Sequence, residues 1–285
     1  MAAAASVKGV IRRIPGVDSA LTARRTSRAT FDRWMDEYVA RHAISSPVPD
    51  GGDPTLASLL SEGAVFLPGY FPSEKVRAVH DRLLPMLEQV RQGTAPAEWD
   101  TVDYREDGIY RLRNPAAYAP DCRELLEDEY LLGLASAYLS GWTAEPAAYV
   151  DYKPDLVHDH TTVLHMDTFR SQVKIFVFLS DIGPANAPLV YWAGSHRDGL
   201  WRRNFDYAFW QGSEAGEHGH VPVTFVRKLR ARGGPEAVEE KQFCGPAGSV
   251  VLADTRGIHR ASNLRDGYRL ELVVKINEQR PAGIR

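Results

Sequence analysis

The sequence is poor in three features, and each absence excludes a class of protein. Its 285 residues hold two cysteines, Cys122 and Cys244, which are too few and too far apart for a disulfide framework or a cysteine zinc site. No apolar run comes near the roughly 18 residues that a membrane helix needs. The 34 Lys and Arg face 37 Asp and Glu, a formal net charge of −3, so neither nucleic acid nor a membrane surface is an expected partner.

The N-terminal residues also lack the apolar core of a secretory signal, because a short alanine run is followed at once by Lys8, Arg12 and Arg13. With two unpaired cysteines, this predicts a cytoplasmic protein. The hydrophobic content of 44% and the charged content of 25% are ordinary for a globular chain. There is no internal repeat, and nothing in the sequence indicates an oligomeric state.

What is present is a run of helical patterns followed by strand patterns. Residues 1–50 form a predicted N-terminal helical extension with a helix through 30–39, and 51–285 form a single predicted domain. Apolar residues at steps of three and four predict a helix over 73–90, and a second helix is expected over 123–139. Strands are predicted at 63–67, 149–153, 172–179, 189–192, 249–252 and 269–276, with the core strands within about 146–276. Helices first and strands afterwards favour an α+β fold.

A long segment, about 198–242, interrupts the predicted strands. It is rich in aromatic and charged residues, including Trp201, Phe205 and Trp210. Long loops inside a compact domain are often functional lids, so the segment is a candidate lid over a binding site; a surface helix is the alternative.

The most informative motif is His165-Met166-Asp167. Residues i and i+2 of a strand point to the same face, so the imidazole and the carboxylate are expected side by side. A second histidine, His259, lies near the predicted strand at 249–252. Two histidines and one carboxylate on one side of a metal form a facial triad, which leaves positions open for O2 and a co-substrate in non-haem Fe(II) oxygenases.

Arg269 follows His259 by ten residues, at the start of the last predicted strand. A guanidinium at that place can hold a carboxylate in a bidentate fork. A metal triad with a carboxylate clamp is what an oxygenase needs if it uses a 2-oxo acid, because one end of 2-oxoglutarate chelates the iron and the distal carboxylate needs a cation.

Several stretches in order resemble the phytanoyl-CoA dioxygenase family of Fe(II)/2-oxoglutarate-dependent oxygenases. The first is Tyr152-Lys153-Pro154, and it is followed by the His165–Asp167 pair. The later stretches are Leu179-Ser180-Asp181, Asn186-Ala187-Pro188-Leu189, Gly194-Ser195-His196, and a run of Gly248, His259, Asn263 and Arg269. Together they cover about residues 146–276, and the segment 63–90 is similar to the family's opening.

The resemblance implies a double-stranded β-helix, or jelly roll, with helices packed outside. It implies that His165, Asp167 and His259 ligate Fe(II), that Arg269 holds the distal carboxylate of 2-oxoglutarate, and that Lys153 contacts this co-substrate. The reaction would oxidise a small-molecule metabolite with O2 and release succinate and CO2. Hydroxylation is the favoured outcome; desaturation, cyclisation and epimerisation stay open, and halogenation is not expected, because related halogenases lack the carboxylate.

The sequence departs from the family pattern at Ala187, at Trp192-Ala193 and at Ala261, none of which is a predicted ligand. Two other functions use a similar barrel: a cupin-like metal-dependent isomerase or dioxygenase that needs no 2-oxo acid, in which Arg269 is structural, and a non-catalytic ligand-binding jelly roll.

Several other residues are expected to have structural or surface roles. We expect His158 and His160 in a solvated loop, His218 and His220 at the surface of the insertion, and His196 in a turn. Lys174, Phe176 and Phe178 follow the ligand pair, with the lysine expected in the barrel interior and the rings in structural roles. Arg111 and Arg113 are candidates either for an anionic ligand or for external salt bridges.

Overall fold

The computed structural model describes residues 27–41, 52–141, 143–154, 162–168, 171–210 and 239–279. Its strands form two antiparallel sheets. The larger has the order β1-β8-β5-β10-β4-β3-β2, and the smaller has the order β7-β6-β9. The bounds of the strands are Ala64–Leu67 for β1, Thr101–Tyr104 for β2, Ile109–Arg113 for β3, Ala147–Lys153 for β4, Gln172–Phe178 for β5, Leu189–Trp192 for β6, Glu240–Phe243 for β7, Val250–Asp254 for β8, His259–Ala261 for β9 and Arg269–Asn277 for β10.

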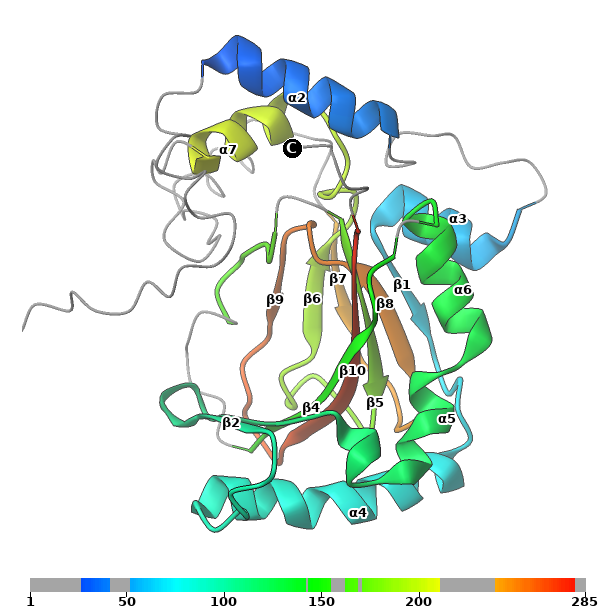
Figure 1. The fold of residues 1–285 in the computed structure, drawn as a ribbon, viewed down its shortest axis with the longest axis vertical. Helices are drawn as coiled ribbons and strands as arrows, with labels where there is room; N and C mark the ends of the chain where they lie inside the picture. The colour runs from blue at the N-terminus through cyan, green and yellow to red at the C-terminus, as the bar shows by residue number, and fades with distance from the viewer. Residues whose placement is uncertain are drawn as a thin grey trace, which may run out of the picture.

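The helices lie on the outer face of the larger sheet and at the two ends of the molecule (Figure 1). Their bounds are Arg28–Arg41 for α2, Pro54–Glu62 for α3, Ser73–Gln92 for α4, Arg123–Leu126 for α5, Glu129–Tyr138 for α6 and Leu200–Trp210 for α7. Short 3-10 turns are η2 at Arg105–Asp107, η3 at Pro115–Ala117 and η4 at Pro120–Cys122. No described helix is both long enough and apolar enough to cross a membrane.

Strand β10 shows why the larger sheet is buried on both faces. Leu270, Leu272, Val274 and Ile276 belong to the core cluster shared with α3, α4 and α6. Successive residues of a strand point to opposite faces, so Arg269, Glu271, Val273 and Lys275 face the other sheet. Val273 lies there in a second core cluster with Phe176 of β5 and Tyr191 of β6. The strand is therefore apolar toward the helices and partly charged toward the interior of the barrel.

The helical covering follows from the apolar stripe that the sequence predicts over 73–90. The buried residues of α4 are Val76, Val79, Leu83, Leu87 and Val90, and they pack on the outer face of the larger sheet. At the start of α3, the carboxylate of Asp53 accepts hydrogen bonds from the backbone of Thr55 and Leu56, which is a good N-cap.

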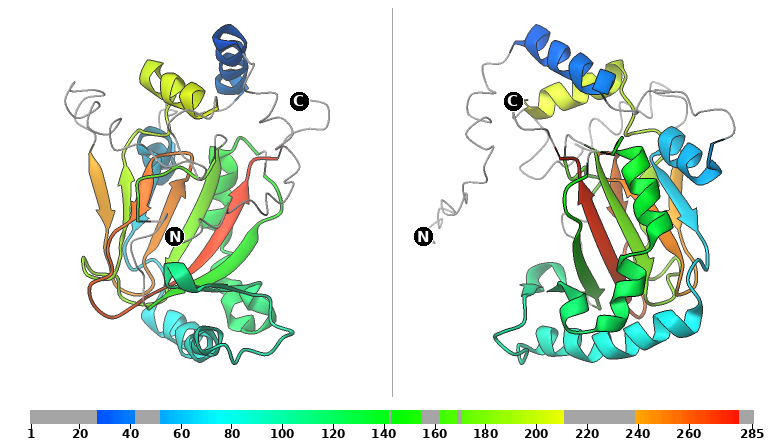
Figure 2. Two further views of the ribbon diagram at one scale, coloured as in Figure 1. Left: turned by 90° about the vertical axis from the view of Figure 1, so that its left-hand side faces the viewer. Right: turned by 45° about the vertical axis from the view of Figure 1, so that its right-hand side comes forward.

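The predicted α+β architecture is confirmed: two antiparallel sheets face one another as in a double-stranded β-helix, with helices outside (Figure 2). The helix predicted at 30–39 is α2, and its Phe31 packs on Tyr207 of α7. Arg203 of α7 bonds Asp36 of α2 at 2.6 Å. Helix α2 therefore packs on the first part of the long insertion, at the end of the sheets opposite α4 (Figure 1).

Candidate metal centre

Two backbone hydrogen bonds hold His165 and His259 opposite one another. The amide of His165 donates to the carbonyl of His259 at 2.9 Å, and the amide of His259 donates back at 2.9 Å. The ring centroids are 4.4 Å apart. The strand geometry expected for His165 and Asp167 is present only as this single β-bridge. The bridge places His165 beside β9.

The protonation of each ring is set by the hydrogen bond that its Nδ1 makes. Nδ1 of His165 lies 2.7 Å from the carbonyl of Val163, and Nδ1 of His259 lies 2.8 Å from the carbonyl of Gly257. A carbonyl only accepts, so each Nδ1 carries the proton and each Nε2 keeps its lone pair. This is how proteins orient histidines that ligate metals.

Asp167 completes the group. Its amide donates to the carbonyl of Thr255 at 3.0 Å, which places the side chain in front of both rings. Its Oδ1 lies 3.7 Å from Nε2 of His165 and 3.8 Å from Nε2 of His259. The three ligand atoms lie within 4.8 Å of one another, a combination that the described part of the chain shows at no other place.

Burial and neighbouring charges favour the protonation states that a metal requires. Burial, aided by His259, lowers the pKa of His165 to about 3, so this imidazole is neutral at physiological pH. Burial alone would raise the pKa of Asp167, but Lys174 and the two histidines outweigh it and hold the pKa well below its usual range. Two neutral imidazoles and one carboxylate fit a divalent ion of the Fe(II) type.

Lys174 is the polar neighbour that fixes the carboxylate. Its Nζ lies 2.7 Å from Oδ2 of Asp167, the oxygen farther from the histidines, and its side chain is 17% exposed. As expected, Lys174 faces the barrel interior. Because Lys174 holds Oδ2, the other carboxylate oxygen, Oδ1, stays directed at the two Nε2 atoms.

The wall behind His259 leaves no room for a side chain at Gly257. A Cβ there would clash with the hydroxyl and ring of Tyr191. The ring of Tyr191 stacks beside His259, with centroids 6.4 Å apart, and its hydroxyl donates to the carbonyl of Asp254 at 2.9 Å. The glycine therefore allows the tyrosine to support the histidine from behind.

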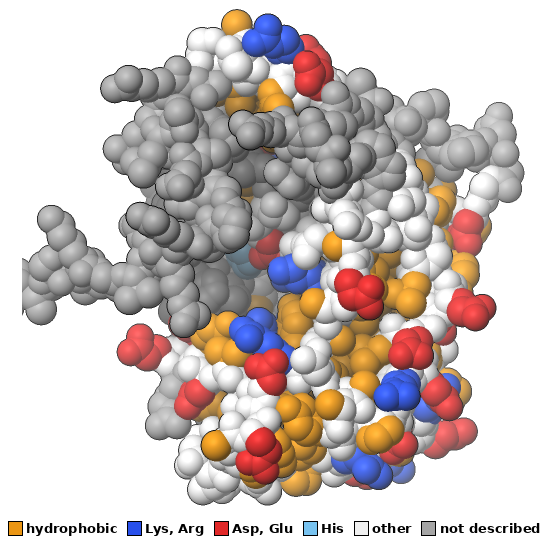
Figure 3. Space-filling view, in the orientation of Figure 1, with side chains coloured by type: hydrophobic (Ala, Val, Ile, Leu, Met, Phe, Trp, Pro, Cys, Tyr) orange, Lys and Arg blue, Asp and Glu red, His pale blue; other side chains and the backbone are white. Residues whose placement is uncertain are grey.

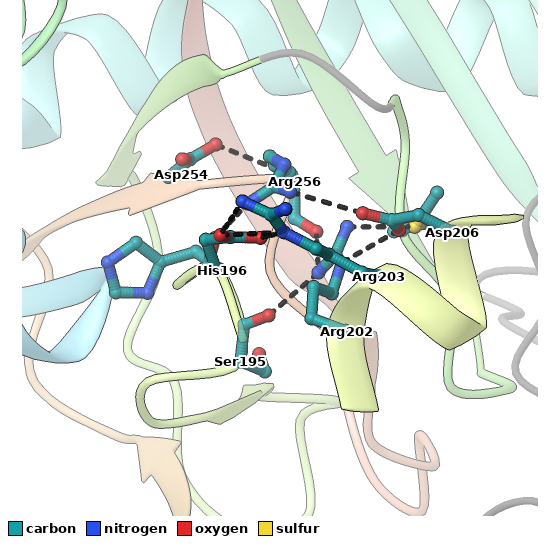
Figure 4. Close-up of polar contacts among 9 residues, drawn as sticks. Ser195, His196, Arg202, Arg203, Asp206, Asp254 and Arg256 are labelled. Carbon is teal, nitrogen blue, oxygen red and sulfur yellow. Dashed lines mark hydrogen bonds and ion pairs between the residues drawn. The ribbon is translucent and has the colours of Figure 1, made fainter. Parts of the chain in front are cut away.

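Helix α7 is bound to the metal-bearing segments by a buried ionic network (Figure 4). Asp206 accepts from Nε of Arg202 at 2.8 Å and from Nη2 of Arg256 at 3.1 Å, and all three side chains are fully buried. Arg202 also donates to the sulfur of Met166 at 3.2 Å and to the carbonyl of Arg256 at 2.9 Å. Met166 lies between two triad residues, so the network joins α7 directly to the site.

The face drawn in Figure 3 shows a histidine, an acidic side chain and basic side chains together in a recess. The rest of that face carries Lys, Arg, Asp and Glu intermixed with apolar side chains. Among the described residues drawn on that face, the Lys and Arg side chains form no continuous basic surface, which agrees with the near-neutral charge of the chain.

The family model described as phytanoyl-CoA dioxygenase matches residues 59–267, which is most of the chain. The chain belongs to the phytanoyl-CoA dioxygenase family. It is thus a non-haem iron and 2-oxoglutarate oxygenase by class, and it carries the facial triad of that class. No curated protein sequence matches it.

Solved structures show the same fold at low sequence identity. EctD from S. alaskensis, solved with 2-oxoglutarate and 5-hydroxyectoine, is 18% identical with a TM-score of 0.59, covering 82% of this chain and 80% of its own. HygX from Streptomyces hygroscopicus, solved with nickel, 2-oxoglutarate and hygromycin B, is 18% identical with a TM-score of 0.54, covering 82% and 88%. The carbocyclase SnoK from nogalamycin biosynthesis is 19% identical with a TM-score of 0.54, covering 80% and 84%.

The two residues that the phytanoyl-CoA dioxygenase resemblance assigns to 2-oxoglutarate lie inside the barrel and face each other. Arg269 on β10 is opposite Lys153 on β4. Both contact Glu271, a buried carboxylate that the sequence analysis did not single out. The sequence could have indicated Glu271, because it lies two residues after Arg269 and therefore on the same face of the strand.

The other polar residues divide between the barrel interior, the surface and segments that are not described. Arg111 bonds Asp151 at 2.6 and 2.9 Å and lies 3.9 Å over the ring of Tyr149, whereas Arg113 is half exposed and 3.7 Å from Asp100. His196 lies in a turn, as predicted, and its Nε2 is 3.1 Å from the carbonyl of Leu60. His158, His160, His218, His220 and residues 211–238 of the predicted lid lie outside the described residues.

We expect the stability of the metal-free protein to fall as the pH drops from 6.5 to 4.5. Burial lowers the pKa of His165 to about 3 and that of His196 to about 4, from 6.5 for an unhindered histidine. The unfolded chain therefore takes up these protons first, and each histidine removes up to about 1.4 kcal/mol per pH unit until its folded pKa is passed. Thermal unfolding with a chelator present measures this. A midpoint that is unchanged between pH 6.5 and 4.5 would contradict it.

Proposed function

We propose that this chain is an Fe(II)- and 2-oxoglutarate-dependent dioxygenase that oxidises a small-molecule metabolite, with hydroxylation as the favoured outcome. The observation that carries the proposal is the convergence of His165, Asp167 and His259, with both Nε2 atoms within 3.8 Å of one carboxylate oxygen. Membership of the phytanoyl-CoA dioxygenase family supports the choice of metal and co-substrate.

Ferrous iron bound with 2-oxoglutarate and O2 supplies the oxidising power to break an unactivated C–H bond, with succinate and CO2 as co-products. The chain's own residues prepare the site. The two imidazoles bind as neutral ligands and Asp167 offsets one positive charge of the ion. Lys174 keeps the second carboxylate oxygen occupied. Arg269 and Lys153 provide the cations for the distal carboxylate of the co-substrate.

The proposed substrate class is supported by solved structures of similar fold. Solved structures of similar fold include an epimerase and a carbocyclase of nogalamycin biosynthesis and a protein solved with hygromycin B. These support a metabolite of secondary metabolism as substrate, and they keep epimerisation and cyclisation beside hydroxylation and desaturation. The cytoplasmic location stays a prediction.

The test is 2-oxoglutarate turnover by the purified protein, reconstituted with Fe(II) and offered a panel of metabolites. We expect succinate formation that requires iron, O2 and 2-oxoglutarate and that rises above the uncoupled background with the right metabolite. A product heavier by one oxygen atom indicates hydroxylation, and one lighter by two hydrogen atoms indicates desaturation or cyclisation. Succinate formation that is the same with and without iron would contradict the proposal.

One observation favours a second candidate, a metal-dependent dioxygenase or isomerase that uses no 2-oxo acid. Arg269 is already paired with a carboxylate of the chain, Glu271, as a structural arginine would be. The two candidates separate on one assay, because only the first converts 2-oxoglutarate to succinate in step with oxidation of the substrate.

A further inference from the structure

A row of charged side chains lies inside the barrel, at the N-terminal end of β10. Arg269 and Glu271 on β10 lie opposite Lys153 and Asp151 on β4, and Asp151 lies opposite Arg111 on β3. These five residues alternate with the apolar residues that face the helices, so all five point into the space between the two sheets.

Glu271 lies at the middle of this row and uses both of its oxygens. Oε1 accepts from Nζ of Lys153 at 2.7 Å. Oε2 accepts from Nε of Arg269 at 2.8 Å and also from Nη2 of the same guanidinium. The Glu271 side chain is 1% exposed. Hydrogen bonds between an ionised carboxylate and a guanidinium or ammonium group are among the stronger ones in proteins.

Arg269 and Lys153 already have partners within the chain. Nη1 of Arg269 donates to the carbonyl of Ala187 at 2.5 Å, so all three nitrogens of this guanidinium have partners within the chain. Lys153 also lies 3.7 Å from Oδ2 of Asp151. Asp151 in turn forms a two-point pair with Arg111. Across the row, three cations face two carboxylates, which leaves one net positive charge.

The ionised form of Glu271 is the stable one. Burial alone would raise the pKa of its carboxyl group, but the charges of Arg269 and Lys153 outweigh burial and hold the pKa below its usual range. At neutral pH, a second carboxylate that approaches these cations therefore meets a buried negative charge, and two like charges close together in a buried site repel strongly.

We propose that Glu271 is a specificity-determining residue for the co-substrate: it occupies the two cations that would hold the distal carboxylate of 2-oxoglutarate, and it weakens the binding of that group. The inference rests on the proposed function, because it concerns the affinity of the 2-oxo acid. It distinguishes this chain from an enzyme whose arginine and lysine are both free. Here the distal carboxylate binds only by displacing Glu271 or by sharing its partners.

The competing explanation is that Glu271 holds Arg269 and Lys153 in the positions that the co-substrate needs. The two explanations predict opposite effects of one substitution. Removing the charge with Glu271→Gln keeps the size of the side chain and one acceptor oxygen. If Glu271 competes with the co-substrate, the variant binds 2-oxoglutarate more tightly; if it serves as a support, the variant binds more weakly.

The experiment titrates the iron-loaded, full-length protein without O2 and follows the visible absorption of the ferrous 2-oxo acid chelate. The two probes are 2-oxoglutarate and 2-oxovalerate, which has the same carbon count but no distal carboxylate. We expect Glu271→Gln to lower the Kd of 2-oxoglutarate at least tenfold and that of 2-oxovalerate less than twofold. The matched control is Glu62→Gln, which removes a carboxylate from the half-exposed pair with Lys241, and it should leave both values unchanged.

An unchanged or raised Kd of 2-oxoglutarate in Glu271→Gln would overturn the inference and leave the proposed function intact. If that variant does not fold, the wild type decides: we expect it to prefer 2-oxoglutarate over 2-oxovalerate by less than tenfold, and a greater preference overturns the inference. A wild type that forms no chelate with either acid contradicts the proposed function itself, and with it the inference.

Discussion

Replacing His165 with alanine is expected to reduce the iron held by the purified protein from about one equivalent to less than about a tenth, and to abolish 2-oxoglutarate turnover. The residue supplies one of three ligand atoms, the other two come from Asp167 and His259, and the described part of the chain offers no further group of this kind. The groups that contact the remaining ligands cannot replace the lost imidazole, because Lys174 is a cation and the Nδ1 atom of His259 faces a backbone carbonyl. Iron content after anaerobic reconstitution measures the first effect, and succinate formation measures the second.

The matched control is His80→Ala. His80 lies on α4, where its ring nitrogens contact Asp81 and the hydroxyl of Tyr268, and it is not part of the triad. This variant should keep its iron. A His165→Ala protein that still holds a full equivalent would show that the ion is bound by other residues.

Replacing Asp206 with asparagine is expected to cost about 3–5 kcal/mol of folding free energy. The carboxylate lies between the guanidinium groups of Arg202 and Arg256, and all three side chains are fully buried. Without it, two cations remain in the interior with backbone carbonyls as their main partners. Urea unfolding of the metal-free protein measures the loss. Since Arg202 also contacts Met166, we expect weaker iron binding in the same variant.

Asp121→Asn provides the comparison for this substitution. Asp121 pairs with Arg82 at 3.5 Å, and both side chains are more than half exposed, so its loss should change stability by less than about 1 kcal/mol. Equal effects of the two substitutions would mean that the buried network does not hold α7 in place.

The metal centre was predictable because its residues obey local rules. His165 and Asp167 lie side by side although only one β-bridge forms at His165. The backbone of each residue is hydrogen-bonded to the segment from the end of β8 to β9. The third ligand, His259, was proposed from the residues alone, but a lone histidine near a strand carries little information, and Arg269 and the family resemblance strengthened the prediction. The apolar periodicities over 73–90 and 269–276 gave α4 and β10 within two residues of their observed ends.

The hairpin formed by β2 and β3 was not predicted. It adds two strands at the edge of the larger sheet, and its residues alternate poorly because charged side chains such as Arg111 point inward. The turn contains Asp107-Gly108, a common hairpin signal, but Asp107 is the last residue of a short 3-10 turn, η2. β7 was also not predicted: Glu240–Phe243 overlaps the end of the predicted lid and has almost no apolar pattern.

The buried charges were harder still to predict. Arg202, Arg256 and Glu271 belong to residue types that are almost never fully buried without a partner, and Arg256 and Glu271 each have a partner from a distant part of the chain, Asp206 and Lys153. Asp206 and Arg256 are 50 residues apart, so sequence spacing carries no sign of the pair. Helix α7 illustrates the consequence: the start of the expected lid is in fact anchored on the metal-bearing segments.

The most direct test is a crystal structure of the protein grown without O2 in the presence of Fe(II) and 2-oxoglutarate. We expect one ion bound by Nε2 of His165, a carboxylate oxygen of Asp167 and Nε2 of His259, with the 2-oxo acid chelating it from the open side. An ion bound elsewhere, or the three side chains turned away from a common point with iron present, would contradict the account.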